Sequence, residues 1–387
     1  MDLDTLPVGR LGIIPLSSCL NAGKKIDQYI VEWRKEREEH SYNPMSLGYL
    51  RDSYLIEAKV PRFGSGEAKG TISQSIRGDD LFILVDVCNH NISYSVCGYE
   101  NFMSPDDHFQ DLKRVIAAAG GKARRINVIM PYLYEGRQHN RNGRESLDCA
   151  NALQELVDMG VENIITFDAH DARVQNAIPL HGFETVQPVY QFIKNLLRHE
   201  PELQIDPKNL MVISPDESGM PRAIYMANVL GVDMGMFYKR RDFSTVIDGR
   251  HPIVAHEFLG SSVENKDVII IDDMISSGDS MLEVCALLKK KKVRKIFMCS
   301  TFGLFTNGLG KFDKAYEQGL FDRLLTTNLV YQPTELFEKK YYVNCDMSKF
   351  VALIIDTLNH DLSISELLDP IDRINNVLKK HRNHEKI

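Results

Sequence analysis

The chain has 387 residues, of which 43% are hydrophobic and 26% are charged, and its formal net charge is −7. This length predicts two domains, and the acidic balance gives no basis for binding nucleic acid or an anionic membrane. The seven scattered cysteines are typical of a reducing compartment. Because the N-terminus is acidic and no apolar run reaches the length of a membrane span, we expect a cytoplasmic protein.

The first half of the chain alternates apolar runs with amphipathic segments. Strands are expected at 11–16, 53–60, 81–88, 126–133 and 163–171, and helices at 23–40, 109–121 and 147–160. The intervening segment 89–107 is polar and rich in turn residues, so we expect a surface loop there. Alternation of this kind predicts a parallel sheet covered by helices on both faces.

A second alternating series begins near residue 187. It predicts helices at 188–197 and 220–231, a loop from 242 to about 266, and strands at 210–216, 233–241, 268–271, 295–302 and 323–330. A last helix, 348–358, is expected to fold back on the first half. We therefore expect an N-terminal domain of residues 1–185, completed by 346–387, and a C-terminal domain of residues 186–345.

The stretch DVIIIDDMISSGDSMLEV (267–284) carries the clearest chemistry. The β-branched run Val268–Ile271 predicts a buried strand that stops at Asp272 and Asp273. The turn that follows, opening a helix, can cradle an anion with its backbone N–H groups. The two carboxylates can accept hydrogen bonds from ribose hydroxyls or hold a hard cation. The alternative is a capped helix beside a surface acidic pair.

This stretch resembles the phosphoribosyl pyrophosphate (PRPP) motif of type I phosphoribosyltransferases and their relatives. The resemblance implies that Asp272 and Asp273 bind the ribose hydroxyls. It also implies a loop that binds the 5′-phosphate, formed here by Ser276, Ser277, Gly278, Asp279 and Ser280. The motif alone does not distinguish an enzyme that consumes PRPP from one that makes it.

Other segments resemble the ribose-phosphate pyrophosphokinase family, in the family's order over roughly residues 50–370. The segment 60–84 is similar to that family's ATP-site hairpin, and VIMPYLYEGRQ is similar to the strand that leads into its Arg-Gln pair. The resemblance implies ATP-binding roles for Phe63, Ser65, Glu67, Arg137, Gln138 and His139.

Three further segments imply the remaining roles. FDAHDARVQ resembles the segment whose histidine, here His170, helps to hold Mg²⁺ near the ATP phosphates. VISPDESGMPRA resembles the strand whose aspartate, here Asp216, contacts the substrate ribose or a metal-bound water. YKRRD resembles the start of the mobile catalytic loop, with Lys239 and Arg241 in its basic positions.

Three positions depart from the family's pattern. His139 stands where an aspartate normally follows the Arg-Gln pair, Ser65 where a carboxylate or amide is expected, and Asp279 where a glycine is usual. These departures favour the alternative of a non-catalytic regulatory subunit. A phosphoribosyltransferase that consumes PRPP is a further alternative, although it would not need the hairpin or Arg137.

The resemblance implies two similar doubly wound parallel-sheet domains of phosphoribosyltransferase type. It implies a pyrophosphokinase that uses ATP, ribose 5-phosphate and Mg²⁺. In the family the hairpin completes the ATP site across a subunit interface, so we expect a homo-oligomer, a dimer or a hexamer.

Overall fold

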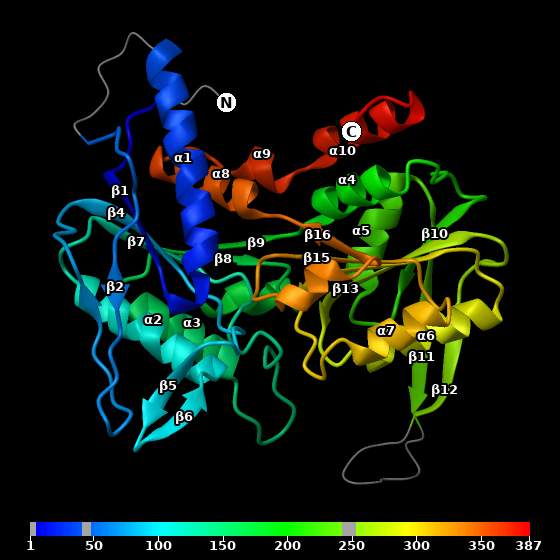
Figure 1. Cartoon of the computed structure of the whole chain (residues 1–387), viewed down its shortest axis with the longest axis horizontal. Helices are drawn as coiled ribbons and strands as arrows, with labels where there is room; N and C mark the ends of the chain where they lie inside the picture. Colours follow the sequence, from blue (N-terminus) through cyan, green and yellow to red (C-terminus); the bar gives the residue numbers. More distant parts are fainter. Residues whose placement is uncertain (1–4, 41–47, 242–252) are drawn as a thin grey trace. The chain divides into compact units, whose positions relative to one another are not determined.

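The computed structural model describes residues 5–40, 48–241 and 253–387. The chain forms two compact units, each with one mainly parallel sheet and helices on both faces (Figure 1). Unit 1 comprises Met1–Gln187, Leu329–Tyr331 and Asp346–Asp369, and unit 2 comprises Pro188–Asn328, Gln332–Cys345 and Pro370–Ile387.

Unit 1 contains a five-stranded sheet in which every neighbouring pair is parallel. Its strands in spatial order are β1 (Arg10–Pro15), β4 (Asp79–Leu84), β7 (Arg125–Ile129), β8 (Asn163–Phe167) and β9 (Gly182–Val186). All residues of β4 are buried. This is the expected state of a near-continuous apolar strand covered on both faces.

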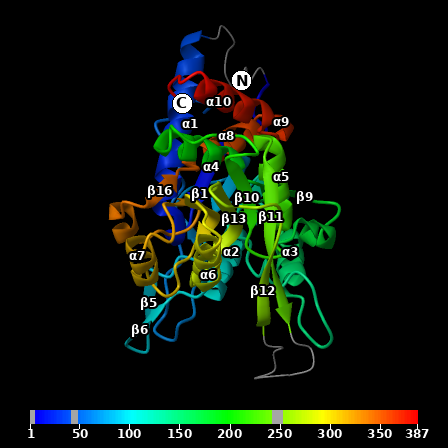
Figure 2. The same ribbon diagram turned by 90° about the vertical axis from the view of Figure 1, so that its right-hand side faces the viewer.

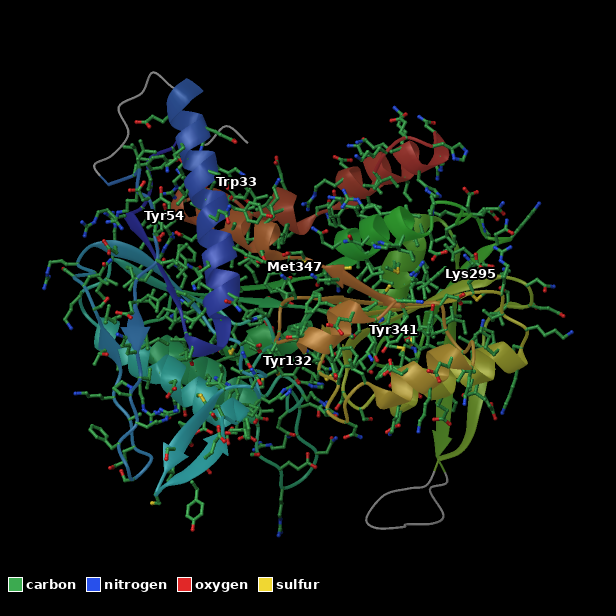
Figure 3. The ribbon with its side chains drawn as sticks, viewed as in Figure 1. Trp33, Tyr54, Tyr132, Lys295, Tyr341 and Met347 are labelled. Carbon is green, nitrogen blue, oxygen red and sulfur yellow. The ribbon has the colours of Figure 1, made fainter. Side chains whose placement is uncertain are left out.

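Helices cover the two faces of this sheet. Leu112 of α2 (Pro105–Ala119) and Leu153 of α3 (Asp148–Asp158) share a core with Leu81 and Val128 of the sheet. α1 (Leu20–His40) packs against β1 and α8 (Ser348–Asn359). Tyr54, labelled in Figure 3, is buried nearby. The shorter helices are η1 (Ser17–Cys19), η2 (Ala172–Ala177) and α9 (Ser365–Leu368).

Two antiparallel hairpins extend from unit 1. β2 (Ala58–Lys59) pairs with β3 (Thr71–Ile72), and β5 (Ser93–Val96) pairs with β6 (Tyr99–Phe102). The expectation of a loop over 89–107 was therefore wrong. The expected strand 53–60 is also interrupted, because Leu55 forms only an isolated parallel bridge with Ile13 and the strand β2 comprises only Ala58 and Lys59. Cys97 and Gly98 link β5 to β6 with φ of 50° and 84°, as a tight two-residue hairpin turn requires.

Unit 2 contains a seven-stranded sheet. Its strands in spatial order are β12 (Ile253–Leu259), β11 (Asp233–Arg241), β10 (Leu210–Ser214), β13 (Asp267–Ile275), β14 (Ile296–Gly303), β15 (Arg323–Thr327) and β16 (Tyr342–Cys345). The pairs are parallel except β11 with β12, which run side by side in opposite directions (Figure 2). The loop expected over 242–266 was wrong for its later part, which forms β12. Residues 242–252 lie outside the described residues.

The strands of unit 2 alternate their side chains between two cores. Leu210 and Val212 of β10 face α4 (Val189–His199), α5 (Met220–Leu230) and α10 (Ile371–Arg382). Met211 and Ile213 face α6 (Asp279–Lys290) and α7 (Gly310–Glu317). A short helix, η3 (Thr334–Glu338), precedes β16. Within the described ranges, no helix has the length and apolar character of a membrane span.

Candidate active site

The chain order of the unit 2 strands reverses beside β10. From β10 the chain passes to β11 on one side and later enters β13 on the other. In open α/β sheets, ligands bind in the crevice outside the carboxyl ends of strands at such a reversal. Asp216 follows β10, and Ser276–Gly278 follow β13. The residues of these two segments that the sequence predicts to bind ribose 5-phosphate therefore lie at the same edge of the sheet.

Strand β13 does not stop at the two carboxylates, as the sequence had suggested. It continues to Ile275, because Asp272 and Met274 keep their ladder positions against Ser300 and Phe302 of β14. The predicted strand end was wrong because the backbone of these acidic residues still pairs with β14, although their side chains are polar. Side chains alternate along a strand, so Asp272 and Asp273 point to opposite faces of the sheet.

The carboxylate of Asp273 is buried. One of its oxygens lies 3.6 Å from Nη2 of Arg222, which is also buried, on α5. The other oxygen accepts the backbone N–H of Met274 at 2.8 Å. Asp273 thus joins the end of β13 to the helix that follows Asp216.

The carboxylate of Asp272 is half-buried and accepts the N–H of Asp273 at 2.9 Å. Burial, reinforced by the negative charges of Asp273 and Asp216, raises the pKa of Asp272 well above its usual range. The Asp216 side chain accepts the N–H and the hydroxyl of Ser218 at 3.0 and 2.6 Å. A hydrogen-bond donor entering the crevice would relieve this concentration of negative charge.

The turn before α6 has the form of an anion cradle. Gly278 has a φ of 84°, and a Cβ at this position would lie 2.2 Å from the ring of Phe312. Only glycine therefore fits here. Gly278 is the N-cap of α6, and among the described residues no side chain caps it, so N–H groups of the first turn can meet an anion. The carbonyl of Ser276 accepts the N–H of Thr306 at 3.0 Å, which fixes the turn from outside.

The negative charge of Asp279, a residue that departs from the family pattern, is compensated by a nearby cation. The Asp279 carboxylate is exposed and forms an ion pair with Lys311 of α7, while its second oxygen accepts the hydroxyl of Ser277 at 2.9 Å. Both bonds hold the pKa of Asp279 below its usual range, with that to Lys311 contributing most. Ser280 follows on the exposed first turn of α6.

The backbone of β11 extends through the predicted basic positions. Lys239 pairs with His256 and Arg241 with Ile253 of β12. Their side chains lie outside the described part of the structure, as does the following loop, so their catalytic roles stay predictions.

A second group of predicted residues lies at the carboxyl edge of the unit 1 sheet. The rings of His139, which follows β7, and His170, which follows β8, have centroids 5.3 Å apart. Nε2 of His139 lies 3.6 Å from Oδ2 of Asp171. The exposed Arg173 holds the pKa of Asp171 low, at about 2. In the described ranges, no three His, Cys, Asp or Glu side chains are arranged to hold a metal ion by themselves.

The side chain of Gln138 holds the rest of this loop by hydrogen bonds to backbone carbonyls. Nε2 of Gln138 donates to the carbonyls of Asn140 and Ser146 at 3.1 and 2.8 Å. Arg137 is exposed. A polar loop after β7 is thus closed on itself and presents Arg137 to solvent.

The hairpin predicted to bind adenine presents its aromatic residue to solvent. The side chain of Phe63 is 53% exposed. A ring that stacks on a ligand must be accessible, whereas a ring in the core would be buried. The hydroxyl of Ser65 donates to a carboxylate oxygen of Glu67 at 3.0 Å. Ser65, which stands where the family has a carboxylate or an amide, therefore contacts and orients Glu67.

Sequence reasoning missed Arg222 and Lys311. An arginine among the apolar residues of MPRAIYMA was a usable signal, because a charge on the buried face of a helix needs a partner. Lys311 follows an unremarkable turn and gave no such signal.

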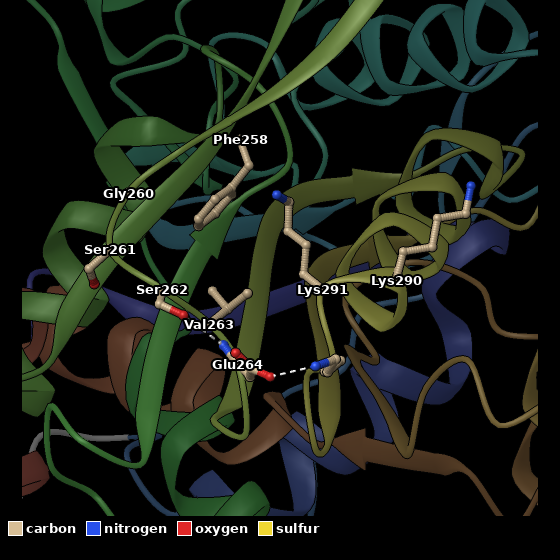
Figure 4. Close-up of a pocket in the computed structure, with 9 residues that line it drawn as sticks. Phe258, Gly260, Ser261, Ser262, Val263, Glu264, Lys290 and Lys291 are labelled. Carbon is tan, nitrogen blue, oxygen red and sulfur yellow. Dashed lines mark hydrogen bonds and ion pairs between the residues drawn. The ribbon is translucent and has the colours of Figure 1, made fainter.

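The structure also contains a cavity of about 470 Å³ away from these residues (Figure 4). Lys291 Nζ lies 5.5 Å from the ring centroid of Phe258, and Lys292 pairs with Glu264 at 2.8 Å. These residues surround the loop that enters β13, at the end opposite the phosphate turn. Because ligands of such sheets bind at the carboxyl ends, we do not assign the substrates to this cavity.

Two protein-family models match the chain. A model described as the N-terminal domain of ribose phosphate pyrophosphokinase matches residues 12–160. A model described as a phosphoribosyl transferase domain matches residues 184–333. The two matches follow one another and together span most of the chain.

Curated relatives match over both segments. The chain is 27% identical over 311 residues to the ribose-phosphate pyrophosphokinase of Mycoplasma genitalium, covering 79% of this chain and 85% of that protein. It is 29% identical over 279 residues to that of Buchnera aphidicola subsp. Schizaphis graminum, covering 71% and 79%. The crystal structure of phosphoribosylpyrophosphate synthetase from Mycobacterium smegmatis has the same fold, with a TM-score of 0.69 at 17% identity over 91% of this chain and 99% of that one.

Proposed function

We propose, since the chain belongs to the ribose-phosphate pyrophosphokinase family, that it transfers the pyrophosphoryl group of ATP to the anomeric hydroxyl of ribose 5-phosphate. The products are PRPP and AMP. The anomeric oxygen attacks the β-phosphorus in line, the bond from that phosphorus to the α-phosphate oxygen breaks, and AMP leaves. In phosphoryl-transfer chemistry of this kind the protein acts mainly by positioning and by stabilising charge.

The observation that carries this proposal is the shared carboxyl edge of the parallel neighbours β10 and β13. Asp272 accepts hydrogen bonds from the ribose hydroxyls, and the turn Ser276–Ser280 holds the 5′-phosphate with its N–H groups and hydroxyls. Asp216 faces the ribose from the neighbouring strand end. Asp273 is held by Arg222 and keeps the end of β13 in place.

ATP is assigned to unit 1. Phe63 stacks on adenine and Glu67 accepts from its amino group, while Arg137, Gln138 and His139 hold the phosphate and ribose end. Mg²⁺ prefers oxygen ligands and usually keeps substrate phosphates and water in its shell. The rings of His139 and His170, 5.3 Å apart, fit a cation that arrives with ATP and takes one or two protein contacts. When bound, Mg²⁺ neutralises charge on the phosphates.

Lys239 and Arg241 are assigned to the transition state. Their strand ends at the same carboxyl edge as the phosphate turn. Two cationic side chains that close over the transferred group can stabilise the negative charge that gathers on it and exclude water.

Three further features complete the proposal. Units 1 and 2, with the bounds given under the fold, act as the two domains. The exposed Phe63 loop completes the ATP site of a neighbouring subunit, so the active species is at least a dimer and is either a dimer or a hexamer. The enzyme works in the cytoplasm.

The three departures are compatible with catalysis. Ser65 orients Glu67, Lys311 compensates Asp279, and His139 lies beside Asp171. A regulatory subunit would not need these compensations, and for this reason we favour the enzyme.

The test is release of AMP from ATP. We expect release to require both ribose 5-phosphate and a divalent cation, and to stop when the cation is chelated. A protein that binds both substrates but releases no AMP would instead be the regulatory subunit.

A further inference from the structure

The hairpin β5–β6 lies against the loop that carries Phe63 and Glu67. The backbone N–H of Cys97, at the tip of the hairpin, donates to the carbonyl of Gly64 at 2.9 Å. A methyl group of Val96 lies 3.1 Å from the position that a Cβ on Gly66 would occupy. Both segments belong to unit 1, and Figure 1 shows β5 and β6 beside the arm that includes β2.

Arg62, the residue before Phe63, is fixed from two directions. Its guanidinium carbon lies 4.6 Å from the ring centroid of Tyr94 on β5. Its two terminal nitrogens donate to both oxygens of Asp111 on α2, at 2.6 and 3.0 Å. The hydroxyl of Tyr94 donates to Asp107 at 3.0 Å, which holds the ring in place. The planar guanidinium is therefore stacked by one element and bound at its edge by the other.

The loop between these supports is short and exposed. Phe63 N–H donates to the carbonyl of Glu67 at 2.7 Å, and Gly66 N–H donates to the carbonyl of Phe63 at 2.9 Å. Gly66 has a φ of 93°, which glycine adopts without strain. A loop of this kind loses conformational entropy when a ligand orders it. Contacts that order it in the free protein remove part of that cost.

We propose that the β5–β6 hairpin is a positioning element for ATP, which holds the Phe63–Glu67 loop in its nucleotide-binding shape through Tyr94 and the Cys97 backbone. The inference rests on the proposed function, because it takes this loop to bind adenine. Tyr94 is a positioning residue that acts through Arg62.

The first experiment removes the hairpin. Met103 N–H donates to the carbonyl of Ile92 at 2.8 Å, so residues 93–102 can be replaced by Gly-Gly between two ends that already meet. Without the hairpin, ATP would have to order the side chains of Phe63 and Glu67 on binding. The entropy lost in ordering two side chains predicts a rise of about 5- to 100-fold in the KM for ATP. The KM for ribose 5-phosphate should stay within about twofold. Hydrogen exchange at the amides of Phe63 and Gly66 should become faster.

Point variants separate positioning from general damage. Tyr94→Leu removes the ring and the hydroxyl, and should raise the KM for ATP, whereas Tyr94→Phe keeps the ring over Arg62 and should recover most of the affinity. Tyr99→Leu is the matched control, because Tyr99 is on the same hairpin and 76% exposed. It should leave both KM values unchanged.

Failure of this inference is distinct from failure of the proposed function. An unchanged KM for ATP and unchanged exchange at Phe63 and Gly66 after excision would overturn the positioning role. Equal rises in both KM values would overturn it too, because they indicate damage to the whole unit. A wild-type protein that releases no AMP would remove the proposed function. The exchange measurement would still decide whether the hairpin orders the loop.

Discussion

Arg222 of α5 and Asp273 near the end of β13 form a buried ion pair, with Nη2 and Oδ2 3.6 Å apart. Burial and the negative charges of Asp273 and Asp216 instead raise the pKa of the adjacent Asp272 carboxyl. Two neighbouring residues of one motif thus have different surroundings. We propose that Asp273 supports the strand end and that Asp272 faces the substrate.

This difference predicts opposite effects on stability and binding. Asp273→Asn removes the carboxylate charge that lies 3.6 Å from the buried Arg222 and should lower the free energy of unfolding by about 1–3 kcal/mol. Asp272→Asn removes a carboxylate whose raised pKa makes its charge unfavourable in the fold, so stability should stay the same or rise. Its affinity for ribose 5-phosphate should fall about 10- to 150-fold, because a charged acceptor is lost.

Denaturant titration and ribose 5-phosphate titration of the two variants test this assignment. ATP affinity is the internal control and should change little in Asp272→Asn. A larger loss of stability in Asp272→Asn than in Asp273→Asn would contradict the division of tasks.

The pair of Asp279 and Lys311 predicts a compensating double variant. Lys311→Met leaves a negative charge beside the bound 5′-phosphate and should raise the KM for ribose 5-phosphate about 3- to 5-fold at low salt. Asp279→Asn in the same chain should restore it. Lys314→Met is the control, because Lys314 is exposed on the same helix. Additive effects of the two changes would show that the pair is not coupled.

The buried carboxyl of Asp86 predicts a pH dependence of stability. Burial raises its pKa from 3.8 to about 7, against the opposing effect of N–H donors from Cys88 and Tyr331. The folded state then holds a proton more tightly than the unfolded state between about pH 4 and 7, so stability falls as pH rises through this window. The stability of the wild type relative to Asp86→Asn should fall by ~1–4 kcal/mol over it. Urea titrations of both proteins measure this difference, and a constant difference would exclude the titration.

Lys239 and Arg241 should act on the rate constant. Interactions made mainly in the transition state lower kcat when they are removed and leave ground-state binding nearly intact. Lys239→Ala should lower kcat by about 10²–10³, with a much smaller change in ATP affinity. Arg241→Ala should behave similarly. Lys290→Ala, which removes an exposed cation at the far end of α6, is the control. Near wild-type kcat values in both variants would remove these residues from the mechanism.

The parts of the fold that sequence predicted are those with a buried apolar pattern. The run Val268–Ile271 is buried on both faces, and its strand was predicted for that reason. The hairpin β5–β6 was missed because its side chains are exposed or half-buried and show no apolar alternation. Its pairing depends on the backbone ladder and on the turn at Cys97–Gly98. β9 and β16 were missed because short edge strands with polar residues resemble turns.

The candidate site divides in the same way. Asp272, Gly278 and His170 could be proposed because their neighbours in sequence carry the motif. The cations that pair with Asp273 and Asp279, which are Arg222 and Lys311, come from other elements and are brought near only by the fold. Sequence could therefore indicate candidate substrate contacts, but not that the surroundings of Asp272 and Asp273 differ.

In the proposed reaction, two phosphoryl groups move together from ATP to ribose 5-phosphate. The most direct measurement incubates ATP radiolabelled at the β-phosphorus with ribose 5-phosphate and Mg²⁺, and separates the products by chromatography. We expect AMP without label, and label in a pyrophosphate attached to the anomeric carbon, in equal amounts. ADP as the nucleotide product, or release of AMP that does not depend on ribose 5-phosphate, would contradict the proposed reaction.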